Sequence, residues 1–121
     1  MARILFVDDD LFTLDTYKTI IGFFGHDPVL ADTAEQAKSI AFAQPPDAIV
    51  LDMNLPDMHG IDLLRIFKKN ALTEHIPVIM VSASADAVGQ RAVEAGAHIF
   101  LSKPVRPEEL VALIEDYTAQ K

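Results

Sequence analysis

The sequence predicts an α/β fold, a doubly wound three-layer sandwich in which a (βα)5 unit forms a five-stranded parallel sheet between two helix layers. Five short apolar runs recur at intervals of roughly twenty residues, and segments with helical apolar spacing separate most of them. The chain of 121 residues suits a single domain over residues 1–121 and is too short for a barrel of eight βα units.

The first strand and the first helix follow from the start of the chain. Residues 4–7 (ILFV) are a continuous apolar run, as expected for a strand buried on both faces of a parallel sheet. The next segment places four apolar residues on one helix face, namely Leu14, Tyr17, Ile21 and Phe24. Gly25 can adopt the left-handed conformation that ends a helix.

A weaker strand, a second helix and a third strand come next. Residues 28–31 (PVLA) are a weaker strand signal, so we expect this strand at an edge of the sheet. Thr33 and Gln36 match a capping box, which predicts the start of the second helix. Residues 48–51 (AIVL) are wholly apolar and predict a strand buried on both faces.

The second half of the chain repeats this alternation. A third helix follows Gly60, and its apolar residues are Leu63, Leu64 and Phe67. Residues 78–81 (VIMV) and 99–101 (IFL) predict two more strands buried on both faces. Between them, residues 86–95 predict a helix that Gly89 weakens by about 1 kcal/mol relative to alanine. Pro107 suits the first turn of a fifth helix.

Polar side chains follow four of the apolar runs. They are Asp8 and Asp9 after the first strand, Asp52 after the third, Ser82 after the fourth and Lys103 after the fifth. In an open α/β sheet, the carboxyl ends of the strands border the crevice in which ligands bind. The sequence therefore predicts that three carboxylates, a hydroxyl and an ammonium group meet at this edge.

Three carboxylates at one place require cations. Unit like charges about 5 Å apart repel each other by roughly 3 kcal/mol per pair at an effective dielectric constant near 20. Lys103 supplies one positive charge, and hard oxygen ligands suit Mg²⁺, with Mn²⁺ as a second candidate. A carboxylate can also attack phosphorus to form an aspartyl phosphate, whose oxygens the metal, the ammonium and the hydroxyl stabilise. The pattern therefore favours phosphate chemistry.

Each of these residues also has an ordinary structural interpretation. An acidic residue after a strand is often the N-cap of the next helix, as we expect for Asp10, and Asp52 alone could be a turn residue. Ser82 could be a strand-end hydroxyl of no special role, and Lys103 a surface lysine. Chance alone rarely places all of these groups at four strand ends.

These segments resemble the receiver domains of two-component response regulators, including the chemotaxis receivers, from Arg3 to Leu113. The resemblance is carried by ILFVDDD, DAIVLDMNLPDMHG, PVIMVSASA, EAGAHIFLSKP and PEEL. It implies a flavodoxin-like sheet of strand order 2-1-3-4-5, an order that the sequence pattern alone does not give. It also implies a signalling switch that takes a phosphoryl group from a sensor histidine kinase or a histidine phosphotransfer protein.

The resemblance assigns a role to each matching residue. The metal ligands would be Asp8, Asp9, Asp52 and the backbone carbonyl of Asn54. Asp52 would also be the phosphoacceptor, Ser82 would hydrogen-bond the phosphoryl group, and Lys103 would pair with it. The chain would catalyse only its own phosphorylation and dephosphorylation and would not act on another substrate.

Other positions carry finer expectations from the resemblance. Phe100 matches an aromatic switch that moves together with Ser82, although a plain core aromatic is a serious alternative. The peptide bond before Pro104 would be cis, a rare geometry by base rates. Asn54 and Ser84 would flank the path of attacking water and so set the phosphoryl lifetime. His59, where the family usually has an acidic or amide residue, is expected to face solvent.

The expected output surface consists of the fourth helix, the fifth strand and the fifth helix. It would rearrange on phosphorylation and contact a downstream protein or effector domain, or a second phosphorylated copy. One alternative is an aspartyl-nucleophile phosphatase, but Asn54 stands where such enzymes of the haloacid-dehalogenase type place a second aspartate. Another is a scaffold that works without phosphorylation, although such receivers typically lose one of the acidic or lysine positions, and all are present here.

Composition narrows the partners further. Ten basic and eighteen acidic residues give a net charge of −8, from which we expect no direct binding to nucleic acid and no binding to anionic membranes. No segment is apolar over a membrane-spanning length, and there is no basic signal region, so we expect a cytoplasmic protein. The absence of cysteine excludes disulfides and thiolate chemistry.

Overall fold

Five strands and five helices alternate along the computed structural model, which describes residues 2–83 and 87–119 and, for residues 87–90, the backbone only. The strands are β1 (Arg3–Val7), β2 (Asp27–Ala31), β3 (Ala48–Asp52), β4 (Val78–Ser82) and β5 (Ile99–Ser102). The helices are α1 (Leu11–Phe23), α2 (Ala34–Ala43), α3 (Gly60–Lys69), α4 (Ala87–Glu94) and α5 (Pro107–Ala119). No described helix has both the length and the apolar character of a membrane span.

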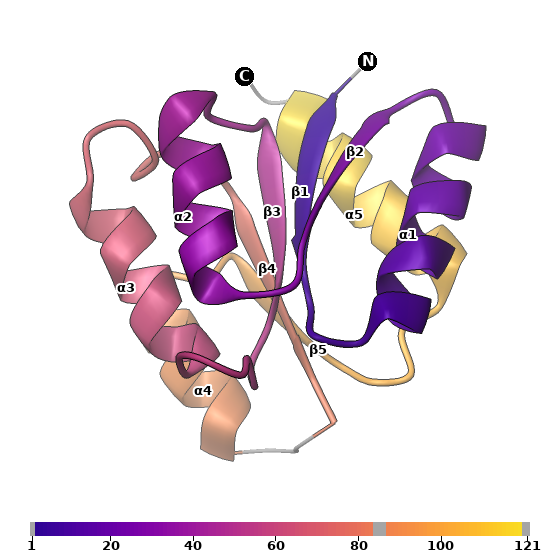
Figure 1. Cartoon of the computed structure of the whole chain (residues 1–121). Helices are drawn as coiled ribbons and strands as arrows, with labels where there is room; N and C mark the ends of the chain where they lie inside the picture. The colour runs from indigo at the N-terminus through magenta and orange to yellow at the C-terminus, as the bar shows by residue number, and fades with distance from the viewer. Residues whose placement is uncertain (1, 84–86, 120–121) are drawn as a thin grey trace.

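All five strands are parallel and lie in the order β2-β1-β3-β4-β5 (Figure 1). This confirms the flavodoxin-like topology. The order changes direction between β1 and β3, and such a point leaves a crevice at the carboxyl ends of the two strands. Val7 of β1 pairs with Leu51 of β3, so the next residues, Asp8 and Asp52, lie at the same level, although Asp52 still pairs with Val81 of β4.

Helices α2, α3 and α4 cover one face of the sheet, and α1 and α5 cover the other (Figure 1). Each strand contributes alternate residues to the two cores, because successive side chains point to opposite faces. The first core includes Leu5, Val7, Ile49, Leu51, Val78 and Met80. The second includes Ile4, Phe6, Val50, Ile79 and Val81. Burial on both faces explains why these strands read as continuous apolar runs in the sequence.

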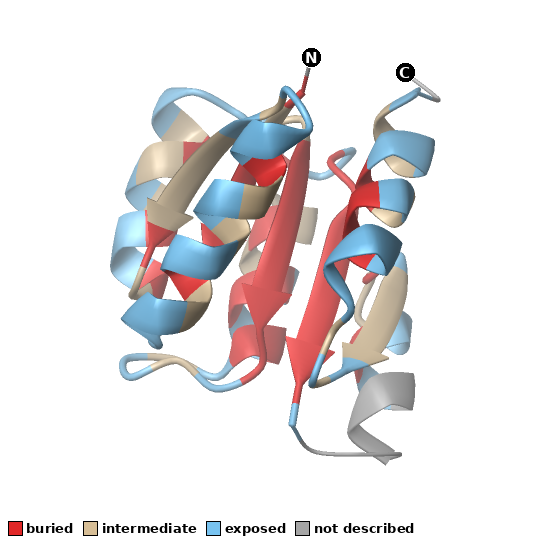
Figure 2. Ribbon diagram, turned by 90° about the vertical axis from the view of Figure 1, so that its right-hand side faces the viewer, coloured by how far each residue is buried: buried red, intermediate tan, exposed pale blue. Residues whose placement is uncertain are grey.

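Burial decreases from the centre of the sheet to its edges (Figure 2). Strands β1, β3 and β4 are buried over nearly their whole length, whereas β2 and β5 are only half-buried. The predicted edge position of β2 is confirmed. The prediction that β5 is buried on both faces is wrong, because β5 pairs with β4 alone and forms the second edge of the sheet.

The predicted helix ends are mostly found. Thr33 Oγ1 accepts a hydrogen bond of 3.1 Å from the Gln36 amide at the start of α2. Gly25 follows α1 in the left-handed region, with a φ of 83°. Phe24, which was predicted on the buried face of α1, is 50% exposed instead. Its amide still donates a helical hydrogen bond to the Ile20 carbonyl, but as the C-cap residue it lies at the very end of α1, with its ring beside that of the exposed Phe23.

The two ends of the described chain lie at the same end of the sheet, opposite the carboxyl ends of the strands (Figures 1 and 2). His26 Nδ1 accepts a hydrogen bond of 3.1 Å from the Ala2 amide, and His26 Nε2 lies 2.9 Å from Glu115 Oε2 of α5. This histidine therefore connects the residue before β1 to α5 through the turn that follows α1.

Candidate functional site

The carboxyl ends of the strands bring the predicted polar side chains to one edge of the sheet. Asp8 follows β1, Asp52 ends β3, Ser82 ends β4 and Lys103 follows β5. The first three are buried, with exposed fractions of 1%, 5% and 0%, and Lys103 is partly buried. A polar group held this far from water must find partners, so the contacts among these residues are informative.

Lys103 lies between the two buried carboxylates. Its Nζ donates a hydrogen bond of 3.0 Å to Asp8 Oδ2 and stands 3.2 Å from Asp52 Oδ1. The other oxygen of Asp8 accepts a hydrogen bond of 2.9 Å from the Asp10 amide, which fixes the orientation of that carboxylate. Asp10 in turn is the predicted N-cap of α1, and its Oδ1 accepts from the Phe12 amide at 3.0 Å. One ammonium group thus holds the ends of β1, β3 and β5 together.

Asp9 completes a cluster of three carboxylates. It is exposed, and one oxygen each of Asp8, Asp9 and Asp52 lie within 4.8 Å of one another. When all three are ionised, Lys103 balances only one of the charges. Like charges at about this distance repel by roughly 3 kcal/mol per pair at an effective dielectric constant near 20. A hard divalent cation with oxygen ligands, such as Mg²⁺ or Mn²⁺, would therefore fit this group of donors.

The charges of the cluster shift the pKa of Asp52 and of Lys103. Burial raises the pKa of Asp52, the nearby Asp8 charge raises it further, and Lys103 opposes both only in part. Burial alone would lower the pKa of Lys103, but the hydrogen bond to Asp8 and the charges of both buried carboxylates outweigh it, so this pKa is raised. Lys103 therefore stays charged, whereas Asp52 ionises less readily than an ordinary aspartate.

The β3–α3 loop, residues 53–59, closes tightly behind Asp52. The Gly60 amide donates a hydrogen bond of 2.6 Å to the Met53 carbonyl, and Asn54 and His59 form an isolated antiparallel bridge. A Cβ atom on Gly60 would come within 2.9 Å of the Met53 carbonyl oxygen and would be closer still to the Asp52 carbonyl oxygen. Only glycine allows α3 to begin this close to the acidic site.

His59 has a local structural role. It is exposed, as expected, and its Nδ1 accepts a hydrogen bond of 3.3 Å from the Ile61 amide, so it caps α3. The carbonyl expected to coordinate a metal belongs to Asn54, whose side chain is exposed.

Sequence reasoning assigned no functional role to two residues near the site, Asp57 and Tyr17. The carboxylate of Asp57 accepts hydrogen bonds from the Ala34 amide at 2.8 Å and the Glu35 amide at 3.0 Å. Burial raises the pKa of Tyr17, and that pKa also responds to the charges of the site, since Lys103 lowers it. The apolar spacing of α1 indicated a buried Tyr17 but not its neighbours, and no local pattern indicated the partners of Asp57.

The remaining predicted positions are placed as follows. The Ser82 carbonyl accepts a hydrogen bond of 2.8 Å from the Lys103 amide, which links the ends of β4 and β5. Phe100 is partly buried and packs against the core under α2, α3 and α4. The Lys103–Pro104 peptide bond is cis. Ser84 lies outside the described residues.

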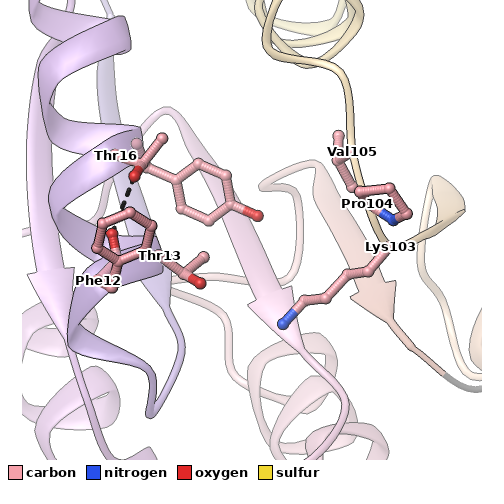
Figure 3. A pocket seen from close by; sticks show the side chains of 7 residues that line it. Phe12, Thr13, Thr16, Lys103, Pro104 and Val105 are labelled. Carbon is pink, nitrogen blue, oxygen red and sulfur yellow. Dashed lines mark hydrogen bonds between the residues drawn. The ribbon is translucent and has the colours of Figure 1, made fainter.

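A pocket of about 440 Å³ opens beside the site, between α1 and the segment that follows β5. Its lining residues are Phe12, Thr13, Thr16, Tyr17, Lys103, Pro104 and Val105. Figure 3 shows the Lys103 side chain extending between these two walls, with the labelled threonines of α1 on one side and Pro104 and Val105 on the other. The site is therefore accessible from this side, next to Phe12, which is 79% exposed.

Comparisons with known proteins agree on one family. A family model described as the response regulator receiver domain matches residues 4–115. The phosphate regulon transcriptional regulatory protein PhoB of Pseudomonas aeruginosa is 34% identical over 113 residues, which are 93% of this chain and 49% of that protein. The DNA-binding response regulator MtrA of Mycobacterium tuberculosis is 33% identical over 93% of this chain and 48% of its own length. The chain thus spans about half the length of these relatives.

Solved structures match over nearly the whole chain. A CheY-like response regulator receiver domain protein from Methanospirillum hungatei has a TM-score of 0.92 and 32% identity, covering 99% of this chain and 95% of that one. A putative response regulator from Chloroflexus aurantiacus has a TM-score of 0.92 and 29% identity, covering 98% of each chain.

These relatives contradict one expectation. We expected no direct binding to nucleic acid, but MtrA is named a DNA-binding response regulator and PhoB a transcriptional regulatory protein. That expectation was drawn from the net charge of −8, which describes the long-range field of this chain alone. MtrA and PhoB are about twice as long as this chain, and the net charge of one half does not determine whether such a protein binds DNA. The net charge of this chain was therefore the wrong evidence for excluding nucleic acid as a partner.

Proposed function

Because the chain belongs to the receiver domain family of two-component response regulators, we propose that it is a phosphorylation-controlled signalling switch with Asp52 as the phosphoacceptor. The observation that carries the proposal is the buried arrangement in which Lys103 Nζ contacts both Asp8 and Asp52, with Asp9 at its rim. This arrangement combines a nucleophile and a fixed positive charge with an excess of negative charge that a divalent cation would neutralise, and phosphoryl transfer uses such a nucleophile and such cations.

The proposed reaction is transfer from a phosphohistidine, carried in the cytoplasm by a sensor histidine kinase or a histidine phosphotransfer protein. A carboxylate oxygen of Asp52 attacks phosphorus and forms the O–P bond of an acyl phosphate. The N–P bond of the donor breaks in the same transfer, and its electron pair stays on the imidazole nitrogen. Lys103, already within 3.2 Å of Asp52, would pair with the transferred phosphoryl group, and the Ser82 hydroxyl would hydrogen-bond it.

The metal site would be built from the carboxylates of Asp8, Asp9 and Asp52 and from the backbone carbonyl of Asn54. Mg²⁺, or Mn²⁺ in its place, would neutralise charge that develops on the phosphoryl oxygens when bound. Asp8 is suited to this role because its two oxygens are already oriented by Lys103 and by the Asp10 amide.

The proposed readout begins at Ser82. A shift of its hydroxyl toward the phosphoryl group would act on the end of β4, which is joined to the segment after β5 by the hydrogen bond from the Lys103 amide. Phe100, only partly buried on β5, is the proposed switch. The surface of α4, β5 and α5 would then change shape and contact a downstream protein, an effector domain or a second copy of the chain.

The relatives suggest what the output controls. PhoB and MtrA bear names that connect them to transcription and to DNA binding, and each is about twice as long as this chain. We propose that phosphorylation of Asp52 governs an output of this kind, with the receiver surface acting on the DNA-binding function.

The proposal also covers what the chain does not catalyse. Asn54 stands two residues after Asp52, and an amide cannot shuttle a proton as the second aspartate of a phosphatase does. We therefore expect turnover of the aspartyl phosphate only, at a rate set by Asn54 and Ser84, and no turnover of external phosphomonoesters.

The test is phosphorylation with acetyl phosphate or a phosphohistidine donor in the presence of Mg²⁺, followed by intact-mass measurement. The parent chain should gain the mass of one phosphoryl group, and Asp52→Asn should gain none. Asp116→Asn, which changes an exposed carboxylate on α5, is the matched control and should react like the parent. A parent chain that stays unmodified, or an Asp52→Asn variant that is modified equally, would refute the assignment.

A further inference from the structure

We infer that Asp57 is a positioning residue for the metal site, because it fastens the β3–α3 loop to the amino terminus of α2 and thereby holds the Asn54 carbonyl in place. The inference rests on the proposed function, in which that carbonyl is a metal ligand. Asp57 itself touches neither the metal nor the phosphoryl group.

The carboxylate of Asp57 contacts the first turn of α2 directly. Both oxygens of Asp57 are engaged, Oδ1 by the Ala34 amide at 2.8 Å and Oδ2 by the Glu35 amide at 3.0 Å. These amides belong to the first turn of α2, whose N–H groups have no partner within the helix. A carboxylate there also interacts favourably with the positive end of the helix dipole. Accordingly, the two hydrogen bonds lower the pKa of Asp57, which keeps it charged.

The contact between Asp57 and α2 restrains the whole β3–α3 loop. Asp57 lies between Asn54 and His59, which bridge each other at the base of the loop. The Gly60 amide closes the same base through its hydrogen bond of 2.6 Å to the Met53 carbonyl. The loop is therefore fixed at its base by its own backbone and at its tip by α2. Releasing the tip would leave the Asn54 carbonyl held from one side only.

Asp57 positions the loop in addition to capping α2, and another residue shares only the capping. Helix α2 has a second cap, because Thr33 Oγ1 accepts a hydrogen bond of 3.1 Å from the Gln36 amide. Thr33 has the same kind of contact with the same helix, but it lies before α2 and not in the β3–α3 loop. Thr33→Ala therefore weakens the helix start without releasing the loop, and it is the matched control for Asp57→Ala.

The experiment is a Mg²⁺ titration by calorimetry on the parent, Asp57→Ala, Asp57→Asn and Thr33→Ala, with the thermal midpoint of each measured in parallel. Asp57→Ala should bind Mg²⁺ about tenfold more weakly, the lower end of the range for residues that orient metal ligands. Asp57→Asn keeps one acceptor oxygen, so its Mg²⁺ affinity should lie between those of the parent and Asp57→Ala. Thr33→Ala should lower the thermal midpoint but keep the parent affinity.

Linkage supplies a second readout that a purely structural role would not change. If the contact of Asp57 helps to bind Mg²⁺, then Mg²⁺ must strengthen the contact by the same free energy. The amides of Ala34 and Glu35 should therefore exchange with solvent more slowly in saturating Mg²⁺, whereas the Gln36 amide, bonded to Thr33, should change less.

The outcomes distinguish the inference from the function on which it rests. If the parent binds Mg²⁺ and Asp57→Ala binds it equally well, or if Thr33→Ala loses as much affinity, the positioning role is wrong and the proposed function stands. The same holds if Mg²⁺ leaves the exchange of Ala34 and Glu35 unchanged. If the parent binds no Mg²⁺ at the carboxylate cluster, both the proposed function and the role of Asp57 fail.

Discussion

Asp52 ionises in surroundings that disfavour its negative charge. Burial and the neighbouring Asp8 raise its pKa above the ordinary value of 3.8, and Lys103 compensates in part. Between 3.8 and the raised pKa, the folded chain binds more protons than the unfolded chain. By linkage, the contribution of Asp52 to stability is full below pH 3.8 and is lost as the pH rises through the folded pKa.

Neutralising this residue should therefore stabilise the metal-free protein. We expect Asp52→Asn to raise the free energy of unfolding near neutral pH by on the order of 1 kcal/mol. The gain should shrink as the pH is lowered toward about 4, where the parent carboxyl takes up its proton. Thermal unfolding in a chelating buffer measures this, with Asp116→Asn as a control for the loss of any exposed carboxylate. A lower midpoint for Asp52→Asn at neutral pH would contradict the prediction.

Single residues differ in how far the sequence could place them. Asp8, Asp52 and Lys103 were predictable, because apolar runs mark strands and parallel strands end at one edge. The contact of Asp57 was not, since its partner Ala34 lies 23 positions away and the hydrogen bond joins backbone to side chain. Nor could any pattern select the carbonyl of Asn54, whose assignment came from the family resemblance alone.

At the scale of elements, β3 and α3 approach each other closely at their junction. The start of α3 lies against the backbone of Asp52 and Met53, with no room for a side chain on Gly60. Backbone atoms cannot rotate away as a flexible side chain can, so any Cβ there must displace the strand end or the helix.

Gly60→Ala should consequently destabilise the fold by about 1 to 3 kcal/mol and slow phosphorylation of Asp52. Gly22→Ala is the matched control, since a Cβ on that glycine of α1 meets nothing within 4 Å. Removing a flexible glycine from a helix should stabilise the protein by about 0.5 to 1 kcal/mol and leave phosphorylation unchanged. Chemical denaturation and the mass assay test both, and equal effects of the two substitutions would argue against the close approach at α3.

The elements that sequence reasoning misjudged have physical explanations. Strand β5 has the apolar composition of a central strand, but its burial depends on its neighbours, and only β4 pairs with it. Phe24 continues the apolar spacing of α1 and its amide still bonds to the Ile20 carbonyl, but as the C-cap residue at the end of the helix it lies beside Phe23, another exposed ring. Composition and periodicity therefore identified the elements, whereas the position in the sheet and the point of helix termination decided the burial.

At the scale of the molecule, the acidic cluster should couple metal binding to global stability. A ligand that binds only the folded state stabilises it by about 1.4 kcal/mol at ten times its dissociation constant. We expect Mg²⁺ to raise the thermal midpoint in this saturable manner and a chelator to reverse it. Asp9→Asn should need more Mg²⁺ for the same effect, because it removes an exposed member of the cluster. KCl at equal ionic strength controls for screening of the net charge, and an equal rise in KCl would exclude a specific site.

The contact of His26 with Ala2 and Glu115 has a practical consequence for the whole chain. It brings Ala2 and the C-terminal half of α5 together at the amino-terminal ends of the strands, opposite Asp52, and β1 alone, with five residues at about 3.3 Å each, separates the two ends of the sheet by roughly 16 Å. A fluorophore or a surface anchor attached near Ala2 or on the C-terminal half of α5 would thus lie away from Asp52, the proposed phosphoacceptor. The protein can then be immobilised at this end while the end of the sheet that carries Asp52 faces the solution.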